Sequence, residues 1–457
     1  MSRALDSRVV AYELLYQVEA EDAYANLALP SLIRSHRLDS RDAGFATELA
    51  MGTLRWRGFL DAVIERASDR AIDRIDPPVR DVLRLGAYQI LFMRVPDHAA
   101  VSSSVDLVGV VKYRSAGGFV NASLRRVSER DLSEWRELTT LGIEDEAQRL
   151  AVEWSHVRWQ VAALRDALGA RKAEIGELLE TNNQSPRITG VSRSGDAGIA
   201  ALSDAGGIPG RWSPYAVSID SDPSNIAAVR NGSCGVQDEG SQLVALTLAA
   251  APLEGPDSKW LDLCSGPGGK AALLKFLASE RGAELTAVEL QEHRAALVDK
   301  ALRPIAGSHQ LVVADGRDEQ FATGDFDRVL VDAPCTGLGV LRRRAESRWR
   351  RSQTDVAVLA KLQRQLLTNA LKAIRPGGVV GYATCSPHLA ETEFVVEDVL
   401  EAMPGVRLLN ANEIAMSVPG LRNAEEFRSL ESEGNFLRLW PHLHGTDGMF
   451  LALLTRD

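Results

Sequence analysis

The sequence predicts a domain with a parallel α/β sheet, preceded by an all-helical domain. Two observations support this prediction. Residues 1–130 carry apolar side chains at helical spacing, as at Val10, Leu14 and Val18, and no glycine-rich loop interrupts them. From residue 236 onward, apolar runs typical of strands alternate with helical segments. The 457 residues suffice for two or three domains of ordinary size.

The composition excludes several classes of protein. With 45% hydrophobic and 25% charged residues, the chain has the make-up of an ordinary globular protein and not of a disordered or fibrous one. The net charge of −10 argues against a protein that coats nucleic acid over its whole surface, but it allows a local basic patch. The most apolar stretch, residues 244–253, is too short to span a membrane. Residues 1–20 mix charged and apolar side chains, unlike a signal peptide, so we expect a cytoplasmic location.

The four cysteines, Cys234, Cys264, Cys335 and Cys385, are too few and too scattered for a disulfide framework. Reduced thiols are the usual state of cysteine in the cytoplasm. The histidines show no metal-ligand spacing with these cysteines, so we expect no metal site.

The chain divides into four predicted parts. Residues 1–130 form the helical domain, and residues 131–150, rich in Glu and Asp, are predicted to be an acidic linker. Residues 151–235 form an intermediate subdomain, in which 151–180 looks helical and the Gly- and Ser-rich 195–210 suggests loops and short strands. Residues 236–457 form the α/β domain. Its expected strands are 260–264, 284–290, 310–313, 326–331 and 378–384.

A glycine-rich turn at residues 264–270, Cys-Ser-Gly-Pro-Gly-Gly-Lys, joins the first of these strands to a helix. Such a turn lets the backbone approach a nucleotide beside a helix N-terminus. The spacing does not fit the dinucleotide pattern G-x-G-x-x-G, and a tight turn without a ligand is the alternative.

Two acids follow the next strands. Glu289 closes the second strand 23 residues after Gly266, near the roughly 20 expected for an acid that binds ribose hydroxyls. Asp315 follows the third strand and offers a second carboxylate at the same sheet edge. The order of strand, glycine turn and two acids favours an adenosine-containing cofactor, although an acid at a strand end is often only solvated.

Two thiols also follow core strands, where open α/β sheets place their ligands. Cys335 comes after residues 326–331, and Cys385 comes after residues 378–384. Each could equally be an inert buried thiol, because cysteine is common in cores.

Cys385 has a further reason to be reactive. Ser386 and Pro387 predict the cap and first position of a helix continuing through residues 391–400, which would place the thiol beside a helix N-terminus. The helix dipole would raise the thiolate fraction, so Cys385 is the better nucleophile candidate. His388 lies close enough to tune this thiol, but a capping or solvated role fits it better.

Six arginines surround one tryptophan between the two thiols, at residues 342–351. Arginine pairs with phosphates and tryptophan can stack on an unpaired base, so the segment is a candidate RNA clamp. A solvated helix face is the alternative. The candidate RNA-binding residues are Arg342, Arg343, Arg344, Arg348, Trp349, Arg350 and Arg351.

The Asp-Ala-Pro-Cys motif at 332–335, the Ala-Thr-Cys-Ser motif at 383–386, and residues 236–242 and 438–450 together resemble the RNA cytosine-C5 methyltransferases of the NOL1/NOP2/Sun group. In the N-terminal part, three segments resemble the NusB fold, an all-helical RNA-binding module. These segments are residues 45–54, 83–91 and 118–126. A NusB-like module ahead of this catalytic domain is similar to the arrangement of bacterial 16S ribosomal RNA methyltransferases.

The resemblance implies a Rossmann-like class I methyltransferase domain behind the NusB-like domain, with S-adenosyl-L-methionine as cofactor. It implies that Cys385 attacks cytosine C6 and that Cys335 assists product release. Asp332 could hold the base through N3 or N4, or could be only a solvated strand-end acid. The residues that match the family's cofactor site are Cys264, Ser265, Gly266, Pro267, Gly268, Gly269, Lys270, Glu289, Asp315 and Asp332.

The expected substrate is small-subunit ribosomal RNA, since the NusB-like domain favours it, and neither a membrane nor an obligate protein partner is expected. The catalytic motifs do not encode the substrate, so the same reaction on transfer RNA stays open. A non-catalytic RNA-binding assembly factor is the third hypothesis. The presence of both cysteines and the glycine turn argues against it.

Overall fold

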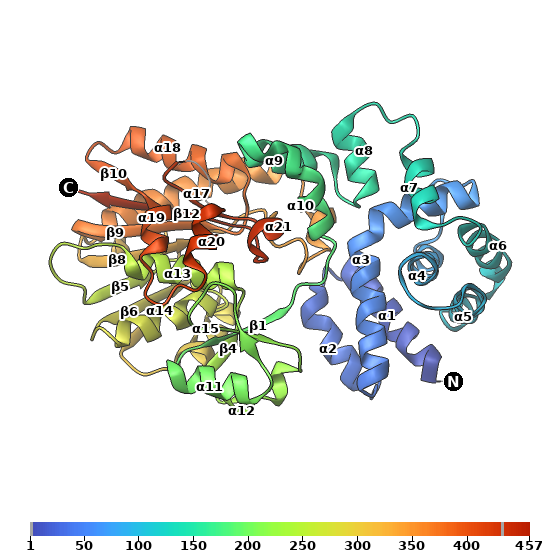
Figure 1. Cartoon of the computed structure of the whole chain (residues 1–457), viewed down its shortest axis with the longest axis horizontal. Helices are drawn as coiled ribbons and strands as arrows, with labels where there is room; N and C mark the ends of the chain where they lie inside the picture. The colour runs from blue at the N-terminus through green and yellow to red at the C-terminus, as the bar shows by residue number, and fades with distance from the viewer. Residues whose placement is uncertain (1–2, 431–433) are drawn as a thin grey trace. The chain divides into compact units, whose positions relative to one another are not determined.

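Consecutive helices run from Arg3 to Thr181 in the computed structural model, which describes residues 3–430 and 434–457 (Figure 1). The chain divides into two units. Unit 1 comprises Met1–Ser185 and Leu341–Arg351, and unit 2 comprises Pro186–Val340 and Ser352–Asp457. The arginine-rich segment therefore belongs to the helical unit, although the residues on both sides of it belong to the α/β unit. Among the described residues, no helix is long and apolar enough to cross a membrane.

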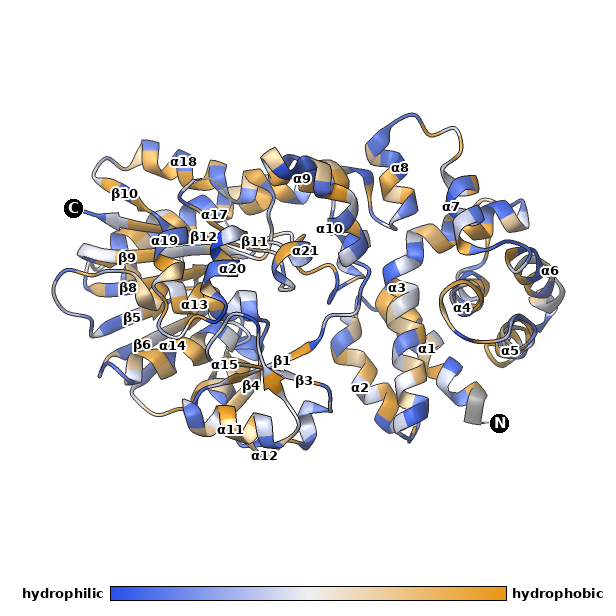
Figure 2. Cartoon of the chain, viewed as in Figure 1, coloured by the Kyte–Doolittle hydropathy of each residue, from blue (hydrophilic) through white to orange (hydrophobic). Residues whose placement is uncertain are grey.

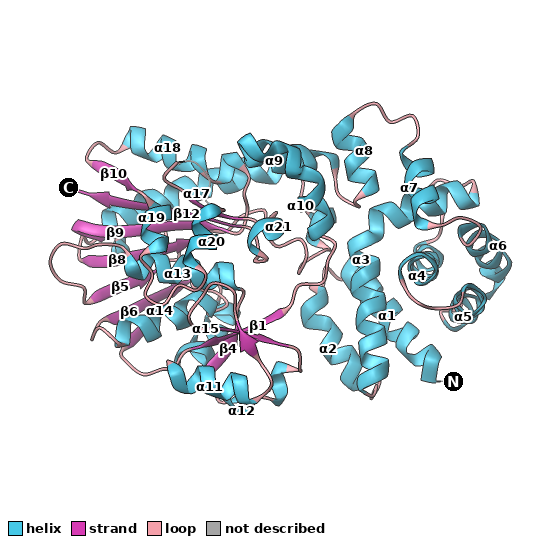
Figure 3. Ribbon diagram, viewed as in Figure 1, coloured by secondary structure: helices cyan, strands magenta, loops and turns pink. Residues whose placement is uncertain are grey.

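The regular elements of unit 1 are all helices among its described residues, as predicted for residues 1–130, and loops join them (Figure 3). Apolar and polar stretches alternate along its helices, and the apolar ones meet in one core (Figure 2). The helices are α1 (Arg3–Ala20), α2 (Ala25–Ser35), α3 (Ser40–Ser68), α4 (Pro77–Phe92), α5 (Asp97–Val110), α6 (Gly117–Val127), α7 (Leu132–Thr140), α8 (Glu146–Glu153), α9 (Arg158–Leu168), α10 (Ile175–Thr181) and α16 (Ser347–Arg350).

The predicted acidic linker at 131–150 is wrong, because this segment is folded onto the helical core. Asp131 and Glu134 form a capping box at the start of α7, and the Asp145 side chain caps α8. Trp135 is buried, and its indole N–H donates to the Val127 carbonyl. The acids are concentrated here because they stabilise helix N-termini, which favour negative charge.

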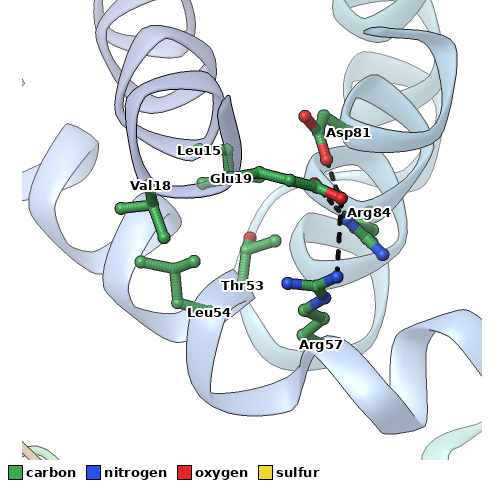
Figure 4. Close-up of a pocket in the computed structure, with 8 residues that line it drawn as sticks. All are labelled: Leu15, Val18, Glu19, Thr53, Leu54, Arg57, Asp81 and Arg84. Carbon is green, nitrogen blue, oxygen red and sulfur yellow. Dashed lines mark hydrogen bonds and ion pairs between the residues drawn. The ribbon is translucent and has the colours of Figure 1, made fainter. Parts of the chain in front are cut away.

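A buried charge cluster joins α1, α3 and α4 beside a small cavity (Figure 4). The Arg84 guanidinium, 3% exposed, donates to the carboxylates of Asp61, Asp81 and Glu19. Burial raises the pKa of Asp81 to about 6, although the charge of Arg84 acts in the opposite direction. One guanidinium thus connects carboxylates from α1, α3 and α4.

Unit 2 begins with a small antiparallel sheet whose strand order is β2-β3-β1-β4. Its elements are β1 (Ile188–Ser192), α11 (Asp196–Asp204), β2 (Ile208–Pro209), β3 (Ala216–Ile219), α12 (Ala227–Arg230) and β4 (Cys234–Val236). Residues 195–210 therefore contain a helix as well as the predicted loops and strand. The predicted intermediate subdomain at 151–235 is split, since 151–185 belong to unit 1.

The main sheet of unit 2 has the order β10-β12-β9-β8-β5-β6-β7, and the run from β9 to β7 is parallel. This confirms the predicted parallel α/β arrangement. The strands of the run are β5 (Lys259–Asp262), β6 (Glu284–Glu289), β7 (His309–Val313), β8 (Phe326–Asp332) and β9 (Ile374–Thr384). An antiparallel edge adds β10 (Val406–Leu409), β11 (Leu437–Leu439) and β12 (Met449–Arg456).

Helices cover both faces of this sheet, and successive residues of β5 show the two layers. Trp260 lies in the apolar cluster that includes α13 and α14, whereas Leu261 lies in the cluster that includes α17 and α18. The helices of unit 2 after the small sheet are α13 (Glu239–Ala250), α14 (Gly269–Ser279), α15 (Glu292–Leu302), α17 (Gln353–Ala373), α18 (Glu393–Ala402), α19 (Ala411–Met416), α20 (Ala424–Ser429) and α21 (Pro441–His444).

The strand order places a topological switch point between β5 and β8. From β5 the chain continues to β6 and β7 on one side, and the later strands β8 and β9 add on the other side. In open α/β sheets, ligands bind outside the carboxyl ends of the strands at such a point. The predicted cofactor-binding and catalytic residues all lie at the carboxyl ends of these strands or in the segments that directly follow them.

Candidate active site

The glycine turn brings its backbone against the carboxylate of Glu289. The Gly266 N–H donates to Glu289 Oε2 at 3.0 Å, and a Cβ built on Gly266 would lie 2.1 Å from that same oxygen. Gly268 has a backbone φ of +105°, which residues other than glycine rarely adopt. These two positions require glycine, and α14 begins directly after them at Gly269.

Asp262, at the end of β5, provides a test of whether a cofactor fits here. Its Oδ2 is buried and has no hydrogen-bond partner, and its pKa is raised to about 7 by burial and then by the charge of Asp332. A buried carboxylate oxygen without a donor suits a ligand that brings an ammonium or hydroxyl group. The residues present therefore fit an adenosine-containing cofactor with an amino acid end.

The two predicted ribose-edge acids differ in their surroundings. Glu289 is 4% exposed, and its Oε1 accepts from the Gln291 N–H while Arg294 lies 3.7 Å away. Asp315 is more exposed and is paired with Arg317, whose hydrogen bond holds the pKa of that carboxyl below its usual value. Both acids lie at the carboxyl ends of neighbouring strands, β6 and β7.

Cys264 and Ser265 have structural roles within the same turn. The Ser265 hydroxyl donates to the Asp262 carbonyl and accepts from the Val288 N–H, which ties the turn to β5 and β6. Burial raises the pKa of the Cys264 thiol well above its usual value. Cys264 is therefore a neutral thiol and a poor nucleophile.

Lys270 pairs with Asp332 across the site. The Lys270 ammonium donates to Asp332 Oδ2 at 2.8 Å. Burial lowers the pKa of Lys270, but the charge and hydrogen bond of Asp332 outweigh burial, and Cys385 raises that pKa further. The ammonium thus remains charged beside both the carboxylate and the thiol.

The structure brings the two predicted cysteines together. Cys335 Sγ and Cys385 Sγ lie 3.3 Å apart, although the residues are 50 positions apart in the chain. The hydrogen bond with Cys385 raises the pKa of Cys335 well above its usual value, and burial raises it further. Either sulfur can be the donor in this hydrogen bond, so the pair shares one contact between two thiols of different loops.

The predicted helix next to Cys385 does not start where expected. Residues Leu389–Glu391 form a 3-10 turn in which His388 Nδ1 accepts from the Ala390 N–H, and α18 begins only at Glu393. The expected dipole effect on the thiol is therefore absent at this position. His388 acts as a cap, which is the role that the sequence favoured for it.

The closing motif of the chain reaches this site through a tight backbone crossing. The Gly339 N–H donates to the Cys385 carbonyl, and the Gly448 N–H donates to the Gly339 carbonyl. A Cβ on Gly339 would lie 2.0 Å from the Gly448 carbonyl oxygen. The crossing joins the loops of both cysteines to residues 445–450. In the sequence, only the glycines of this stretch indicated that two backbone segments approach closely here.

Sequence reasoning also missed Glu391. This carboxylate is 0% exposed and accepts hydrogen bonds from Thr336 and Ser386, the residues that follow the two cysteines. The signal available in the sequence was its position, six residues after Cys385, but an isolated Glu in a polar stretch predicts a solvated side chain.

In the arginine-rich segment, the prediction that Arg348 contacts RNA is wrong. Arg348 is 0% exposed, and within unit 1 its Nη1 donates to the carbonyls of Arg55 and Ser155 and to Asn183 Oδ1, while its Nη2 donates to the Asn182 carbonyl. Burial and the charge of Arg55 lower its pKa to about 9. The side chain connects internal backbone and is not accessible to phosphate.

Three neighbours of Arg348 are also engaged within unit 1. Arg342 is buried and its carbonyl accepts from Arg55 Nε, and Arg350 Nη2 donates to the carbonyls of Val18 and Ala23. Trp349 packs against Gly58, where a Cβ would lie 2.5 Å from its ring. The remaining members are Arg343, which is partly exposed, and Arg344 and Arg351, which are exposed.

Fold and site together define a two-domain protein in which an α/β methyltransferase-type domain follows a helical NusB-type domain. The family described as 16S rRNA methyltransferase RsmB/F matches residues 248–455, and the NusB family matches residues 5–129. A ribosomal RNA small subunit methyltransferase B of Pseudomonas putida is 32% identical over 99% of this chain and 99% of its own. The chain belongs to the RsmB/F family of S-adenosylmethionine-dependent methyltransferases.

Two further likenesses are to a curated relative and to a solved structure. A Mycobacterium tuberculosis H37Rv protein named as a methyltransferase is 48% identical over 99% of this chain and 97% of its own. The crystal structure of PH0851 has a TM-score of 0.78 at 20% identity and covers 100% of this chain and 99% of its own. At that identity the structural likeness shows the fold alone.

Proposed function

We propose that this protein methylates cytosine C5 in small-subunit ribosomal RNA through a covalent bond between Cys385 and cytosine C6. The observation that supports this most is the pair of sulfur atoms 3.3 Å apart at the carboxyl ends of β8 and β9. The substrate class rests on the names of the relatives and on the NusB family match.

The chemistry needs a nucleophile because cytosine C5 reacts poorly by itself. The Cys385 thiolate adds to C6, and the electrons of the C5–C6 double bond make C5 nucleophilic. The glycine turn, Glu289 and Asp315 would hold S-adenosylmethionine, which when bound would supply a sulfonium methyl group for C5, with S-adenosylhomocysteine as the leaving group. Asp332 holds the base through N3 or N4, and Lys270 keeps that carboxylate in place at 2.8 Å.

Release requires a base for the C5 proton. Once Cys385 is bonded to carbon, it no longer shares with Cys335 the thiol hydrogen bond that raises the pKa of Cys335. Cys335 can then lose its proton to solvent and take the proton from C5. The C5–C6 double bond re-forms, the bond from C6 to sulfur breaks, and Cys385 returns as a thiolate.

Bisulfite mapping of total RNA from a deletion strain tests the proposal. Loss of a 5-methylcytosine mark in small-subunit ribosomal RNA, restored by the wild-type gene, is the expected result. A mark lost in transfer RNA instead would correct the substrate. No lost mark in either RNA would favour a non-catalytic RNA-binding role.

Glu289→Ala should weaken cofactor binding measured by calorimetry. Hydrogen bonds to a charged group contribute about 1.5 to 3 kcal/mol, so we expect an affinity loss of roughly 10- to 100-fold. Glu292→Ala is the matched control, since that carboxylate is exposed at the start of α15. Equal affinities for Glu289→Ala and the control would remove Glu289 from the site.

The exposed arginines of the segment predict a change in salt dependence. Arg344→Ala combined with Arg351→Ala should weaken RNA binding and flatten the slope of log affinity against log salt by roughly 0.7 to 0.9 for each phosphate that the protein no longer neutralises. Lys300→Ala, an exposed charge on α15, should leave the slope unchanged. An unchanged slope in the double variant would make the segment purely structural.

A further inference from the structure

A single buried carboxylate accepts hydrogen bonds from the loops of both cysteines. Glu391 Oε1 accepts from the Thr336 N–H at 2.8 Å and from Gln363 Nε2 at 3.2 Å. Glu391 Oε2 accepts from the Thr336 hydroxyl at 2.5 Å and from the Ser386 hydroxyl at 2.7 Å. Thr336 directly follows Cys335, and Ser386 directly follows Cys385.

We propose that Glu391 is the positioning residue that holds the two thiols at their working separation, an inference that rests on the proposed function. The loops leave the neighbouring parallel strands β8 and β9, whose backbones stay joined through the bonds from the Ala333 N–H to the Ala383 carbonyl and from the Gly339 N–H to the Cys385 carbonyl. These bonds hold the backbone of the two loops together but do not contact the side chains that follow the cysteines. Glu391 adds a side-chain link to this backbone pairing, since each of its oxygens binds a residue adjacent to a cysteine. It touches neither substrate nor cofactor in this role.

Glu391 is itself held firmly, as a positioning residue must be. The Tyr382 hydroxyl donates to the Glu391 carbonyl at 2.6 Å, which ties the 3-10 turn to β9. Gln363 Nε2, on α17, also donates to the Pro334 carbonyl at 2.8 Å. The carboxylate thus connects the residues that follow both cysteines with α17.

The chemistry of the side chain explains why an acid is needed. Burying a carboxylate is costly unless donors satisfy it, and hydrogen bonds to an ionised acceptor are stronger than neutral ones. A glutamine offers one acceptor oxygen, so the hydroxyls of Thr336 and Ser386 would face an amide N–H group instead. Glutamine preserves the length of the side chain but only part of its hydrogen bonding.

The charge of Glu391 also acts on Cys335. The hydrogen bond with Cys385, burial, the charge of Cys385 and the charge of Glu391 all raise the pKa of Cys335, in that order. The charge of a Cys335 thiolate in turn raises the pKa of Tyr382, after burial. Removing the negative charge at position 391 lowers the pKa of Cys335, so a pH limb due to its deprotonation shifts to lower pH.

The test measures thiol proximity and catalysis in Glu391→Ala, Glu391→Gln and the control Glu397→Ala, an exposed carboxylate on α18. Proximity is measured as the rate of disulfide formation with diamide. The Cys385 thiolate adds to the azo bond, Cys335 displaces that adduct, and diamide is reduced to the hydrazine as the disulfide forms. Peptide mapping identifies the Cys335–Cys385 product.

In Glu391→Ala we expect the diamide rate to fall by at least tenfold and kcat to fall by roughly 100-fold, as for a misplaced catalytic group. Cofactor affinity should match the control, because the glycine turn is not altered. Glu391→Gln should restore part of both rates and shift the kcat profile to lower pH. A general loss of fold would instead remove cofactor binding as well.

Control-like disulfide formation and kcat in Glu391→Ala would overturn the proposal. If Glu391→Ala does not fold, the decision falls to Glu391→Gln, and control-like values of both quantities there would overturn it. The diamide arm needs no RNA. If the wild-type protein methylates neither RNA, the proposed function fails while the positioning of the thiols is still measured.

Discussion

Cys385→Ala is expected to abolish methyl transfer and to form no covalent complex with RNA. In the proposed mechanism Cys385 is the group that adds to C6, and burial raises the pKa of the Cys264 thiol well above its usual value. Loss of a covalent nucleophile typically costs several orders of magnitude in rate. Incorporation of labelled methyl groups and denaturing gel electrophoresis of protein with RNA measure the two outcomes.

Cys335→Ala should give the complementary result. The remaining Cys385 can attack and C5 can be methylated, but the C5 proton lacks its base, so a protein–RNA complex that survives denaturation should accumulate. Cys234→Ala, a cysteine on β4 in the small sheet, serves as the control and should turn over normally. A complex that accumulates in Cys385→Ala and not in Cys335→Ala would reverse the two roles.

The second large effect is expected on stability. Arg348→Ala should destabilise unit 1 by at least about 3 kcal/mol, because several buried carbonyls lose their donor at roughly 1 to 3 kcal/mol each. Native-state hydrogen exchange measures this locally, and the amides of α10 and of Leu341–Arg351 should lose protection. Arg348→Lys should rescue little, since an ammonium cannot reproduce the forked donor geometry.

Arg351→Ala is the control for this prediction. Its side chain is exposed, and exposed substitutions usually change stability by less than about 0.5 kcal/mol. If Arg348→Ala exchanges like Arg351→Ala, the buried guanidinium contributes nothing and the segment does not depend on it.

The sequence predicted the positions of those site residues that lie at the ends of strands. Glu289 and Asp332 could be placed because each follows an apolar run, and parallel strands present their carboxyl ends at one edge. Cys335 and Cys385 could be paired for the same reason. What periodicity could not provide was the 3.3 Å separation of their sulfur atoms, which depends on contacts between loops far apart in the chain.

The incorrect predictions share a physical cause. A run of arginines looks accessible because its partners, such as the carbonyls of Arg55 and Ser155, are almost 200 or more residues away and are backbone groups that no motif marks. The acidic stretch at 131–150 looked like a linker because helix caps and solvated linkers use the same residue types. Glu391 was overlooked because a buried acid can be inferred only when its donors are known.

The passage of the chain between the units also determines the order in which they are completed during synthesis. Ser185 ends the first stretch of unit 1, and Leu341, which begins the second, is made 156 residues later. At roughly 5 to 20 residues per second, the ribosome adds those residues in about 8 to 30 s. During that interval the carbonyls of Arg55, Ser155 and Asn182 lack the donor that the Arg348 guanidinium later supplies. The helical unit is therefore completed only after the Cys335 loop has been translated and before β9, which leads to Cys385, has been made.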